Sequence, residues 1–436
     1  MNFWELLTSA KTQDFIKEAL SRRLDALQVS TRLAKDGFSN EERSAIMDYM
    51  ALIPKFREKF FDKVSTPDAF LLCDKLALEQ STAQDIGRWK AGLWPCKGSV
   101  HDLCCGMGGD SLFLPANLKV TGVDLDENRL AMFRYNMGVF KKNVETQCAD
   151  VREVARNNDS TGNQDSDYFT IDPARRALEG ENQRDLRNLT PTLEEVIEIS
   201  KRYKGGMAKL PPGYPPAEIP DGTEILYLGG HSDCRECLVL FGALAKNPDT
   251  VRAVIIGKSG ETLAEWSRGR DRSIETLDED LQEKLDKNDS LEGKDRTYRT
   301  ATSKSDLPLG ELDKYIAEPA PVLIRSHLFN AAALICDPNA HLISEGIAYV
   351  TSSMPLPAPG FACYEVLAHA EIATGGVRAM LKEHNVGKIT LKLRGVKLDP
   401  DAEIKRLKPK GKESAILFYT RAYGEKVAIL ARRTEP

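Results

Sequence analysis

The sequence predicts an α/β protein with an open sheet of seven strands, preceded by a helical region and followed by a smaller α+β region. Two observations carry this prediction. A strand, a glycine-rich loop, a helix and further strands follow one another within 100–150, and apolar runs then alternate with helical periodicity as far as residue 256. Because open α/β sheets bind ligands at the carboxyl ends of their strands, we expect the functional residues at that edge.

The glycine-rich loop at 102–110 is the most informative stretch of the chain. Gly106 and Gly108 let the backbone turn tightly and approach a ligand without interference from a Cβ atom. Asp124 ends the next apolar run, 22 positions after Asp102. A carboxylate at such a strand tip can accept hydrogen bonds from ribose hydroxyls, so the pattern predicts a ligand that contains adenosine.

Two classes of nucleotide-binding loop share this geometry. A dinucleotide-binding fold usually carries G-x-G-x-x-G and places a pyrophosphate over a helix N-terminus. Here the frame is Asp102-x-Cys104-x-Gly106-x-Gly108, and an acid before the loop suits a cationic, phosphate-free end of a ligand. A plain turn between a strand and a helix is the third alternative, which the downstream residues have to exclude.

Residues 1–97, which precede the sheet, are predicted to be a helical domain. Apolar residues repeat there at helical spacing, and Ser39 with Glu42 forms a capping-box pattern for a middle helix. We interpret the region as a cap that packs near the ligand site or helps to hold substrate. Arg88 and Lys90 could contact phosphate, although the pattern favours a solvated helix face.

The predicted sheet domain occupies 98–266. A helix at 127–140 leads to a third strand that ends at Asp150, and a fourth strand opens into the sequence Asp172-Pro-Ala-Arg-Arg176. The remaining predicted elements are a helix at 193–203, a fifth strand at 206–210 with Lys209 at its tip, a sixth at 224–228, a helix at 236–245 and a seventh strand at 251–256.

The chain changes character after this domain. Residues 267–314 are charged and poor in aromatic residues, which predicts a linker or mobile excursion that is partly helical at most. Order is expected again over 315–436, with a helix at 376–384, a strand at 389–393 and a hairpin at 416–430. In the strand, apolar residues alternate with polar and basic ones, which predicts a half-buried strand with a basic outer face.

Charge is distributed unevenly along the chain. From Arg378 to Arg433 there are 15 Lys and Arg against 6 Asp and Glu, a net charge of +9, whereas the whole chain carries −5 and the rest of it therefore −14. The basic part of the C-terminal region, 363–436, indicates a polyanionic partner, most simply nucleic acid. A solvated basic surface is the alternative.

Composition bounds the protein class. Hydrophobic residues make up 42% of the chain, no apolar run reaches the roughly 18 residues of a membrane span, and no basic stretch opens a signal peptide. Nine cysteines without a regular framework suit reduced thiols, so we expect a cytoplasmic protein that binds no membrane. Cys234 and Cys237 form one isolated C-x-x-C, which favours a packed helix face over zinc.

The chain resembles bacterial class I S-adenosylmethionine (SAM) methyltransferases with a C-terminal THUMP-like domain, and the resemblance covers most of it outside the charged excursion. The stretches that carry it are 78–81 (LEQS), 102–110 (DLCCGMGGD), 171–176 (IDPARR), 209–213 (KLPPG) and 393–397 (LRGVK). It implies a seven-stranded Rossmann-like sheet with an antiparallel last strand, SAM as cofactor, no metal, and an RNA substrate.

Motif position then implies the role of each site residue. The cofactor-binding residues would be Asp102, Cys104, Gly106, Gly108, Asp124 and Asp150. Asp102 would face the methionine amino end of SAM, Asp124 the ribose and Asp150 the adenine amino group. Asp102 could instead cap a helix, and neighbouring acids could replace Asp150.

For catalysis, the resemblance points to the side chain of Asp172 and the carbonyl group of Pro173. Either could accept a hydrogen bond from an exocyclic amine and orient its lone pair. The sequence departs from the Asn-Pro-Pro-Tyr type of base amino-methyltransferases and is nearer the Asp-Pro-Pro-Arg of uracil-C5 enzymes, but no partner cysteine is evident. The candidate substrate-binding residues are Arg175, Arg176, Lys209, Lys392, Arg394 and Lys397.

The function predicted from these residues is SAM-dependent methylation of an RNA base, in tRNA or rRNA, by direct in-line transfer. Two alternatives remain. One is methylation of a protein or a small molecule, and the other is RNA binding by a protein whose SAM fold no longer catalyses a reaction.

Overall fold

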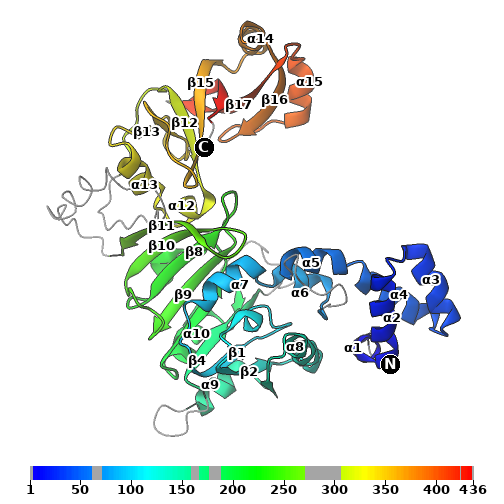
Figure 1. The fold of residues 1–436 in the computed structure, drawn as a ribbon. Coiled ribbons are helices and arrows are strands. Elements are labelled where there is room, and N and C mark those ends of the chain that lie inside the picture. Colours follow the sequence, from blue (N-terminus) through cyan, green and yellow to red (C-terminus); the bar gives the residue numbers. More distant parts are fainter. Residues whose placement is uncertain are drawn as a thin grey trace. The chain divides into compact units, whose positions relative to one another are not determined.

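The computed structural model describes residues 3–60, 71–158, 166–175, 188–270, 306–422 and 424–434, and Figure 1 shows the fold. The chain divides into two compact units. The first comprises Met1–Ile225, Cys237–Pro248 and Ile256–Glu261, and the second Leu226–Glu236, Asp249–Ile255 and Thr262–Pro436. The linker prediction for 267–314 falls largely outside the described residues.

The first unit begins with helices only among the described residues before Gly98. Their bounds are α1 Phe3–Thr8, α2 Ala10–Ser21, α3 Ala26–Lys35, α4 Asn40–Met50, α5 Ile53–Phe60, α6 Lys75–Gln80 and α7 Gln84–Ala91. The predicted capping box starts α4, because the Ser39 hydroxyl accepts from the Glu42 N–H at 3.2 Å and the Glu42 carboxylate from the Ser39 N–H at 2.9 Å. Phe15, Leu33 and Phe56 are buried and anchor these helices.

The predicted α/β class is confirmed by a nine-stranded sheet in the order β11-β10-β8-β9-β7-β4-β1-β2-β3. Its strands are β1 Gly98–Leu103, β2 Leu118–Asp124, β3 Val144–Cys148, β4 Tyr168–Ile171, β7 Gly205–Leu210, β8 Glu224–Gly229, β9 Glu236–Gly242, β10 Thr250–Ile256 and β11 Thr262–Gly269. β1 pairs in parallel with β2 and β4, β2 with β3, and β4 with β7. Parallel strands bring their carboxyl ends to one edge, where the site lies.

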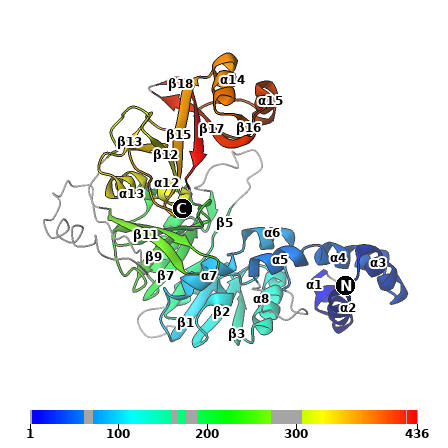
Figure 2. The same cartoon turned by 45° about the horizontal axis from the view of Figure 1, so that its top comes forward.

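Helices connect the parallel strands. α8 Glu127–Val139 joins β2 to β3 and packs against both (Figure 2). α9 Val151–Asn157 follows β3, and α10 Leu193–Ser200 precedes β7 (Figure 1). Short elements complete the unit: the 3₁₀ turns η1 Ser111–Phe113 and η2 Pro216–Glu218, and the antiparallel pair β5 Ala174–Arg175 and β6 Leu189–Thr190.

Two details of the sheet prediction are wrong. The segment 236–245 was expected to be a helix, but 236–242 is strand β9, which runs antiparallel to β7. Residues 236–241 are buried without interruption, and a continuous apolar run fits a buried strand as well as a helix. With β9 and β11 added, the described sheet has nine strands instead of seven. Cys237 consequently lies in a strand, and the packed helix face expected for the C-x-x-C is absent there.

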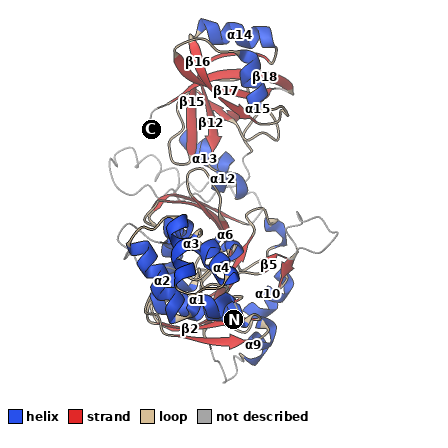
Figure 3. Cartoon of the chain, turned by 90° about the vertical axis from the view of Figure 1, so that its right-hand side faces the viewer, coloured by secondary structure: helices blue, strands red, loops and turns tan. Residues whose placement is uncertain are grey.

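The second unit contains a seven-stranded sheet in the order β13-β14-β12-β15-β18-β17-β16 (Figure 3). Its strands are β12 Tyr315–Pro319, β13 His341–Leu342, β14 Val350–Ser352, β15 Phe361–Glu371, β16 Val386–Leu393, β17 Glu413–Ala422 and β18 Glu425–Arg433, and its helices are α12 Pro321–Arg325, α13 Phe329–Cys336, α14 Thr374–Glu383 and α15 Pro400–Leu407. The predicted hairpin is β17–β18, in which Ile416 pairs with Ala431.

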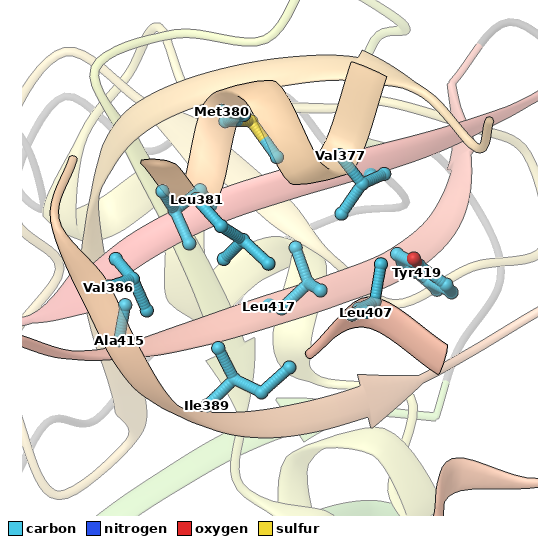
Figure 4. Packing of buried hydrophobic residues seen from close by; sticks show 11 residues of the cluster. Val377, Met380, Leu381, Val386, Ile389, Leu407, Ala415, Leu417 and Tyr419 are labelled. Atoms are coloured by element: carbon cyan, nitrogen blue, oxygen red, sulfur yellow. The ribbon is translucent and has the colours of Figure 1, made fainter. Parts of the chain in front are cut away.

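Each face of this sheet carries its own hydrophobic core. On one face, Val377 and Met380 of α14 and Leu407 of α15 pack onto Leu417 of the sheet (Figure 4). On the other face lie Ile316, Tyr349, Tyr364, Phe418 and Ile429. The strand β16 contributes Val386 and Ile389 to the first core, whereas its Lys388 and Thr390 are exposed.

No helix among the described residues is long and apolar enough to cross a membrane. All nine cysteines are free thiols.

Candidate functional site

The candidate site lies where β1, β2, β4 and β7 end. Asp102 is paired in register with Gly122 of β2 and with Thr170 of β4, so the loops after these three strands start at one level of the sheet. The described glycine loop, Asp124 and Asp172 thus come together from separate parts of the chain, as the sequence predicted.

Every second residue of the glycine loop from 104 to 108 has a left-handed backbone conformation. Cys104, Gly106 and Gly108 have φ of 63°, 53° and 87°. A Cβ atom on Gly108 would lie 2.5 Å from Cε of Met137, which excludes larger residues there. Of the three, Cys104 carries a side chain, although left-handed backbone conformations favour glycine. The loop therefore holds a cysteine in a conformation typical of glycine.

Asp124 ties the loop to the second strand. Its Oδ2 accepts a hydrogen bond from the Gly106 N–H at 3.1 Å, and its Oδ1 accepts one from the Asp126 N–H at 3.1 Å. A Cβ atom on Gly106 would meet only Nη1 of Arg129 at 3.9 Å, so space lies open above the loop. A carboxylate at the rim of an open glycine loop fits the ribose of an adenosine ligand.

Asp102 is buried at the end of β1 and accepts a hydrogen bond from the Ser111 hydroxyl at 2.6 Å. Burial raises the pKa of its carboxyl to about 8, and the nearby acids Asp110, Asp172 and Asp124 add to that rise against the opposing effect of Ser111. A buried acid among other acids favours a cationic partner, so the arrangement fits the ammonium group of SAM. The helix-capping alternative is not what the structure shows, because Asp102 lies within a strand.

Asp150 has a different environment. It is the N-cap of α9, where its Oδ1 accepts from the Arg152 N–H at 2.8 Å, and its Oδ2 accepts from Nη2 of Arg152 at 2.6 Å. The hydrogen bonds from the Arg152 side chain lower the pKa of Asp150. Arg152 also pairs with Glu195 at 3.0 Å. An adenine amino group at Asp150 would therefore share its carboxylate with Arg152.

Asp172 and Lys209 meet at the ends of β4 and β7. Nζ of Lys209 lies 2.8 Å from Oδ2 of Asp172 and donates a second hydrogen bond to the Gln80 carbonyl at 3.3 Å. The structure thereby joins the predicted catalytic acid to a residue predicted to bind substrate. Pro173, the other predicted catalytic residue, is buried directly after Asp172.

The sequence did not predict a buried ion pair formed by Lys90 of α7. Lys90, expected on a solvated helix face, is 3% exposed and pairs with Asp110 of the glycine loop, while its Nζ also donates to the Thr82 hydroxyl at 3.2 Å. Burial alone would raise the pKa of Asp110, but the charges of Lys90 and Lys209 outweigh it and lower that pKa. A helix with one apolar stripe gives no sign that a lysine outside the stripe is buried.

The connection between α6 and α7 packs directly on the glycine loop. A Cβ atom on Gly109 would lie 3.0 Å from Cβ of Ser81 and 3.2 Å from the Thr82 nitrogen. The stretch 78–81, one of those that carry the resemblance, therefore covers the loop, in agreement with the expectation of a helical cap near the site.

The predicted substrate-binding residues are dispersed. The backbone of Arg175 forms part of β5, and Arg176 lies outside the described residues. Lys392 forms an ion pair with Glu318 and lies 5.2 Å above the Tyr364 ring. Arg394 and Lys397 follow on the same segment: Arg394 donates to the Ala348 carbonyl at 2.6 Å and stacks 4.6 Å above the Tyr349 ring, whereas Lys397 is exposed.

Comparison with known proteins supports the resemblance. Residues 361–433 match the family model described as THUMP domain-like. Two uncharacterised S-adenosylmethionine-dependent methyltransferases of Mycobacterium tuberculosis, from strains CDC 1551 / Oshkosh and H37Rv, are each 26% identical over 359 residues, which cover 79% of this chain and 83% of theirs. The crystal structure of a candidate methyltransferase from Porphyromonas gingivalis W83 superposes with a TM-score of 0.71 at 19% identity, covering 97% of this chain and 98% of that one.

These matches confirm the predicted resemblance to bacterial SAM-dependent methyltransferases with a THUMP-like C-terminal domain. The enzyme class and the cofactor expected from the sequence are those in the names of the relatives. The P. gingivalis structure shows that the fold recurs over the whole chain.

Proposed function

We propose that the chain transfers the methyl group of SAM to a base of tRNA or rRNA. The observation that carries this proposal is the pairing of a glycine loop suited to SAM with a THUMP-like region whose segment 378–433 has a net charge of +9. Phosphates attract such a segment irrespective of sequence, and the site residues then act on the base that reaches them.

On the cofactor side, the protein has to hold a cation. Asp102 would take the SAM ammonium group, Asp124 the ribose and Asp150 the adenine amino group. SAM supplies an electrophilic methyl carbon on a sulfonium sulfur. The described residues add positioning: they align the acceptor with that carbon and keep water out, which is most of what an in-line displacement requires.

On the RNA side, several lysines of the THUMP-like region are exposed without being part of its cores. The loop after α15 is held against the start of β16, because the Gly411 N–H donates to the Val386 carbonyl at 3.0 Å and the Lys412 N–H to the Asn385 carbonyl at 2.8 Å. We call the resulting surface the basic corner; its exposed residues are Lys388, Lys408, Lys410 and Lys412. Together with Lys397, these side chains are available to phosphates.

The proposal is tested by comparing total RNA of a deletion strain with that of the parent strain. We expect nucleoside mass spectrometry to find one methylated nucleoside missing from the deletion strain, and the purified protein to restore it with tritiated SAM. The Asp124→Ala variant should restore it poorly, because it loses hydrogen bonds to the ribose that contribute about 1–3 kcal/mol.

If tritium from SAM enters proteins or small molecules of the same extract while the RNA stays unmodified, methylation of a protein or a small molecule is the better proposal. If RNA binds while no extract component accepts label, the RNA-binding protein without catalysis is the better description.

A further inference from the structure

Two lysine–aspartate pairs join β4 and β7, one at each end of the two strands. At the amino ends, Nζ of Lys204 lies 2.6 Å from Asp167, and at the carboxyl ends Nζ of Lys209 lies 2.8 Å from Asp172. The Lys204 side chain is 57% exposed and the Lys209 side chain 16%. The two pairs offer the same link between the same strands, but only the second lies at the candidate site.

Lys209 is held by more than its aspartate. Its ammonium group also donates to the Gln80 carbonyl, in the segment that covers the glycine loop, and its charge helps to lower the pKa of Asp110. An ammonium group has three donors, so it can serve the strand end and the covering segment together. The position of Lys209 is therefore fixed from two sides.

Without a cation, the surroundings of Asp172 are acidic. Burial raises the pKa of Asp102 and of the Cys104 thiol, and the negative charge of Asp172, at the end of the neighbouring strand, adds to both rises. Asp110 and Asp124 belong to the same cluster. Lys209 contacts Asp172 directly, and its positive charge opposes the repulsion from these acids.

We propose that Lys209 is a positioning residue, which orients the Asp172 carboxylate and keeps it ionised so that Asp172 accepts a hydrogen bond from an N–H of the methyl acceptor. This inference rests on the proposed function and narrows its substrate to a nitrogen that carries hydrogen. A carboxylate has about four lone-pair sites, so bonding to Lys209 leaves capacity for the substrate.

The step balances as follows. The acceptor nitrogen donates its lone pair to the methyl carbon of SAM, the carbon–sulfur bond breaks, and sulfur keeps that electron pair as a neutral thioether. The nitrogen becomes cationic and gives its hydrogen-bonded proton to Asp172, which releases it to water. Lys209 stays protonated throughout and exchanges nothing.

The test compares Lys209→Met and Lys209→Arg with Lys204→Met as the matched control. Each full-length variant methylates total RNA of the deletion strain with tritiated SAM between pH 5 and pH 9. We expect Lys209→Met to move the acidic limb of kcat to higher pH by about one unit, so that kcat at pH 6 falls about tenfold. Lys209→Arg should restore the wild-type limb, and KM for SAM should stay unchanged.

Lys204→Met should keep the wild-type pH profile, because its pair lies at the opposite end of the strands. If both methionine variants lose stability and activity equally, with unchanged pH profiles, Lys209 is only a clamp between β4 and β7 and the inference is overturned. The same holds if Lys209→Met shows wild-type kinetics.

A second measurement does not depend on activity. Protein labelled with carbon-13 at the aspartate carboxyl, with Asp172 assigned through Asp172→Asn, gives the titration midpoint of that carboxyl directly. A higher midpoint in Lys209→Met than in wild type supports the inference, and equal midpoints overturn it. Absence of methyl transfer by the wild-type protein would refute the RNA proposal, and the two outcomes remain distinguishable.

Discussion

At the scale of single residues, the site is defined by where charges are placed. Asp102 and Asp150 are both acids near strand ends, but burial raises the pKa of the first and hydrogen bonds from Arg152 lower the pKa of the second. The same side chain is thus buried among other acids in one place and caps the start of a helix in the other. This difference gives a pH signature.

Replacing Asp102 by Asn should stabilise the protein increasingly as the pH rises. The folded-state pKa of Asp102 is raised from 3.8 to about 8, so the folded protein holds this proton more tightly than the unfolded chain. The free energy of unfolding of the wild-type protein therefore falls as the pH rises from about 4 to about 8, because Asp102 ionises more readily in the unfolded chain. Urea unfolding should show Asp102→Asn gaining roughly 2–4 kcal/mol on wild type between pH 5 and pH 8.

Asp150→Asn is the control for this experiment. The pKa of Asp150 is lowered, so its contribution to stability is present above the unfolded pKa and is lost only as the pH falls through the folded value. Asn is also an effective N-cap. The free energy of unfolding of Asp150→Asn should differ from that of wild type by a constant amount between pH 5 and pH 8. A constant difference for Asp102→Asn as well would contradict the buried environment assigned to Asp102.

Residues of the glycine loop could be predicted because local spacing determines their place. Asp102, Gly106 and Asp124 lie at fixed positions relative to two strands that pair in parallel, so a motif locates them. The pair of Lys90 with Asp110 could not be predicted, since it depends on how α7 packs on the loop 20 residues later. Sequence patterns predict contacts that depend on local spacing, whereas contacts such as this ion pair depend on tertiary packing.

At the scale of elements, the C-terminal sheet is strongly curled. β12 and β16 are separated by β15, β18 and β17, which in a flat sheet would place them about 19 Å apart. Glu318 of β12 nevertheless forms an ion pair with Lys392 of β16, and the Tyr364 hydroxyl donates to the same carboxylate at 3.1 Å. The sheet therefore folds over the core that contains Tyr364 and Phe418.

Breaking this link should destabilise the second unit. Lys392→Met leaves Glu318, of which 17% is exposed, without its ion-pair partner, and we expect a loss of about 1–3 kcal/mol in urea unfolding. The double variant Glu318→Gln, Lys392→Met should lose less than the sum of the single variants. Lys201→Met, which removes an ion pair with Glu198 whose partners are 60% and 70% exposed, should cost under about 0.5 kcal/mol.

A loss of the same size in Lys201→Met and Lys392→Met would mean that the Glu318 link is an ordinary surface pair. The predicted basic outer face of β16 is present at Lys388, which is exposed, but Lys392 is drawn against Glu318 and the Tyr364 ring. Period-two alternation identifies the two faces of a strand, but it does not show where a curled sheet covers part of one face.

At the scale of the whole molecule, cofactor and RNA contacts are assigned to different units. Asp102, Asp124 and Asp150, which we propose bind SAM, belong to the first unit, and the THUMP-like match belongs to the second. The order of these regions was predicted from the sequence, because motif and charge change along the chain. The sequence did not predict that the division runs through the strands of the large sheet, since no local pattern marks such a division.

The last prediction concerns the basic corner. Changing Lys388, Lys408, Lys410 and Lys412 to Gln should weaken RNA binding strongly, since each lost phosphate contact reduces the release of counterions. The slope of log affinity against log salt should flatten by about one unit for each contact that is lost. SAM affinity, measured by calorimetry on the same protein, should equal that of wild type, because none of these residues belongs to the first unit.

The matched control changes four exposed lysines of the first unit, Lys35, Lys55, Lys119 and Lys246, to Gln. Both variants lose the same total charge, so a general electrostatic attraction would weaken RNA binding equally in the two. A local interface weakens it only in the basic-corner variant. If both variants bind RNA with the wild-type salt slope, the +9 segment is a solvated surface, and methylation of a protein or small molecule becomes the better proposal.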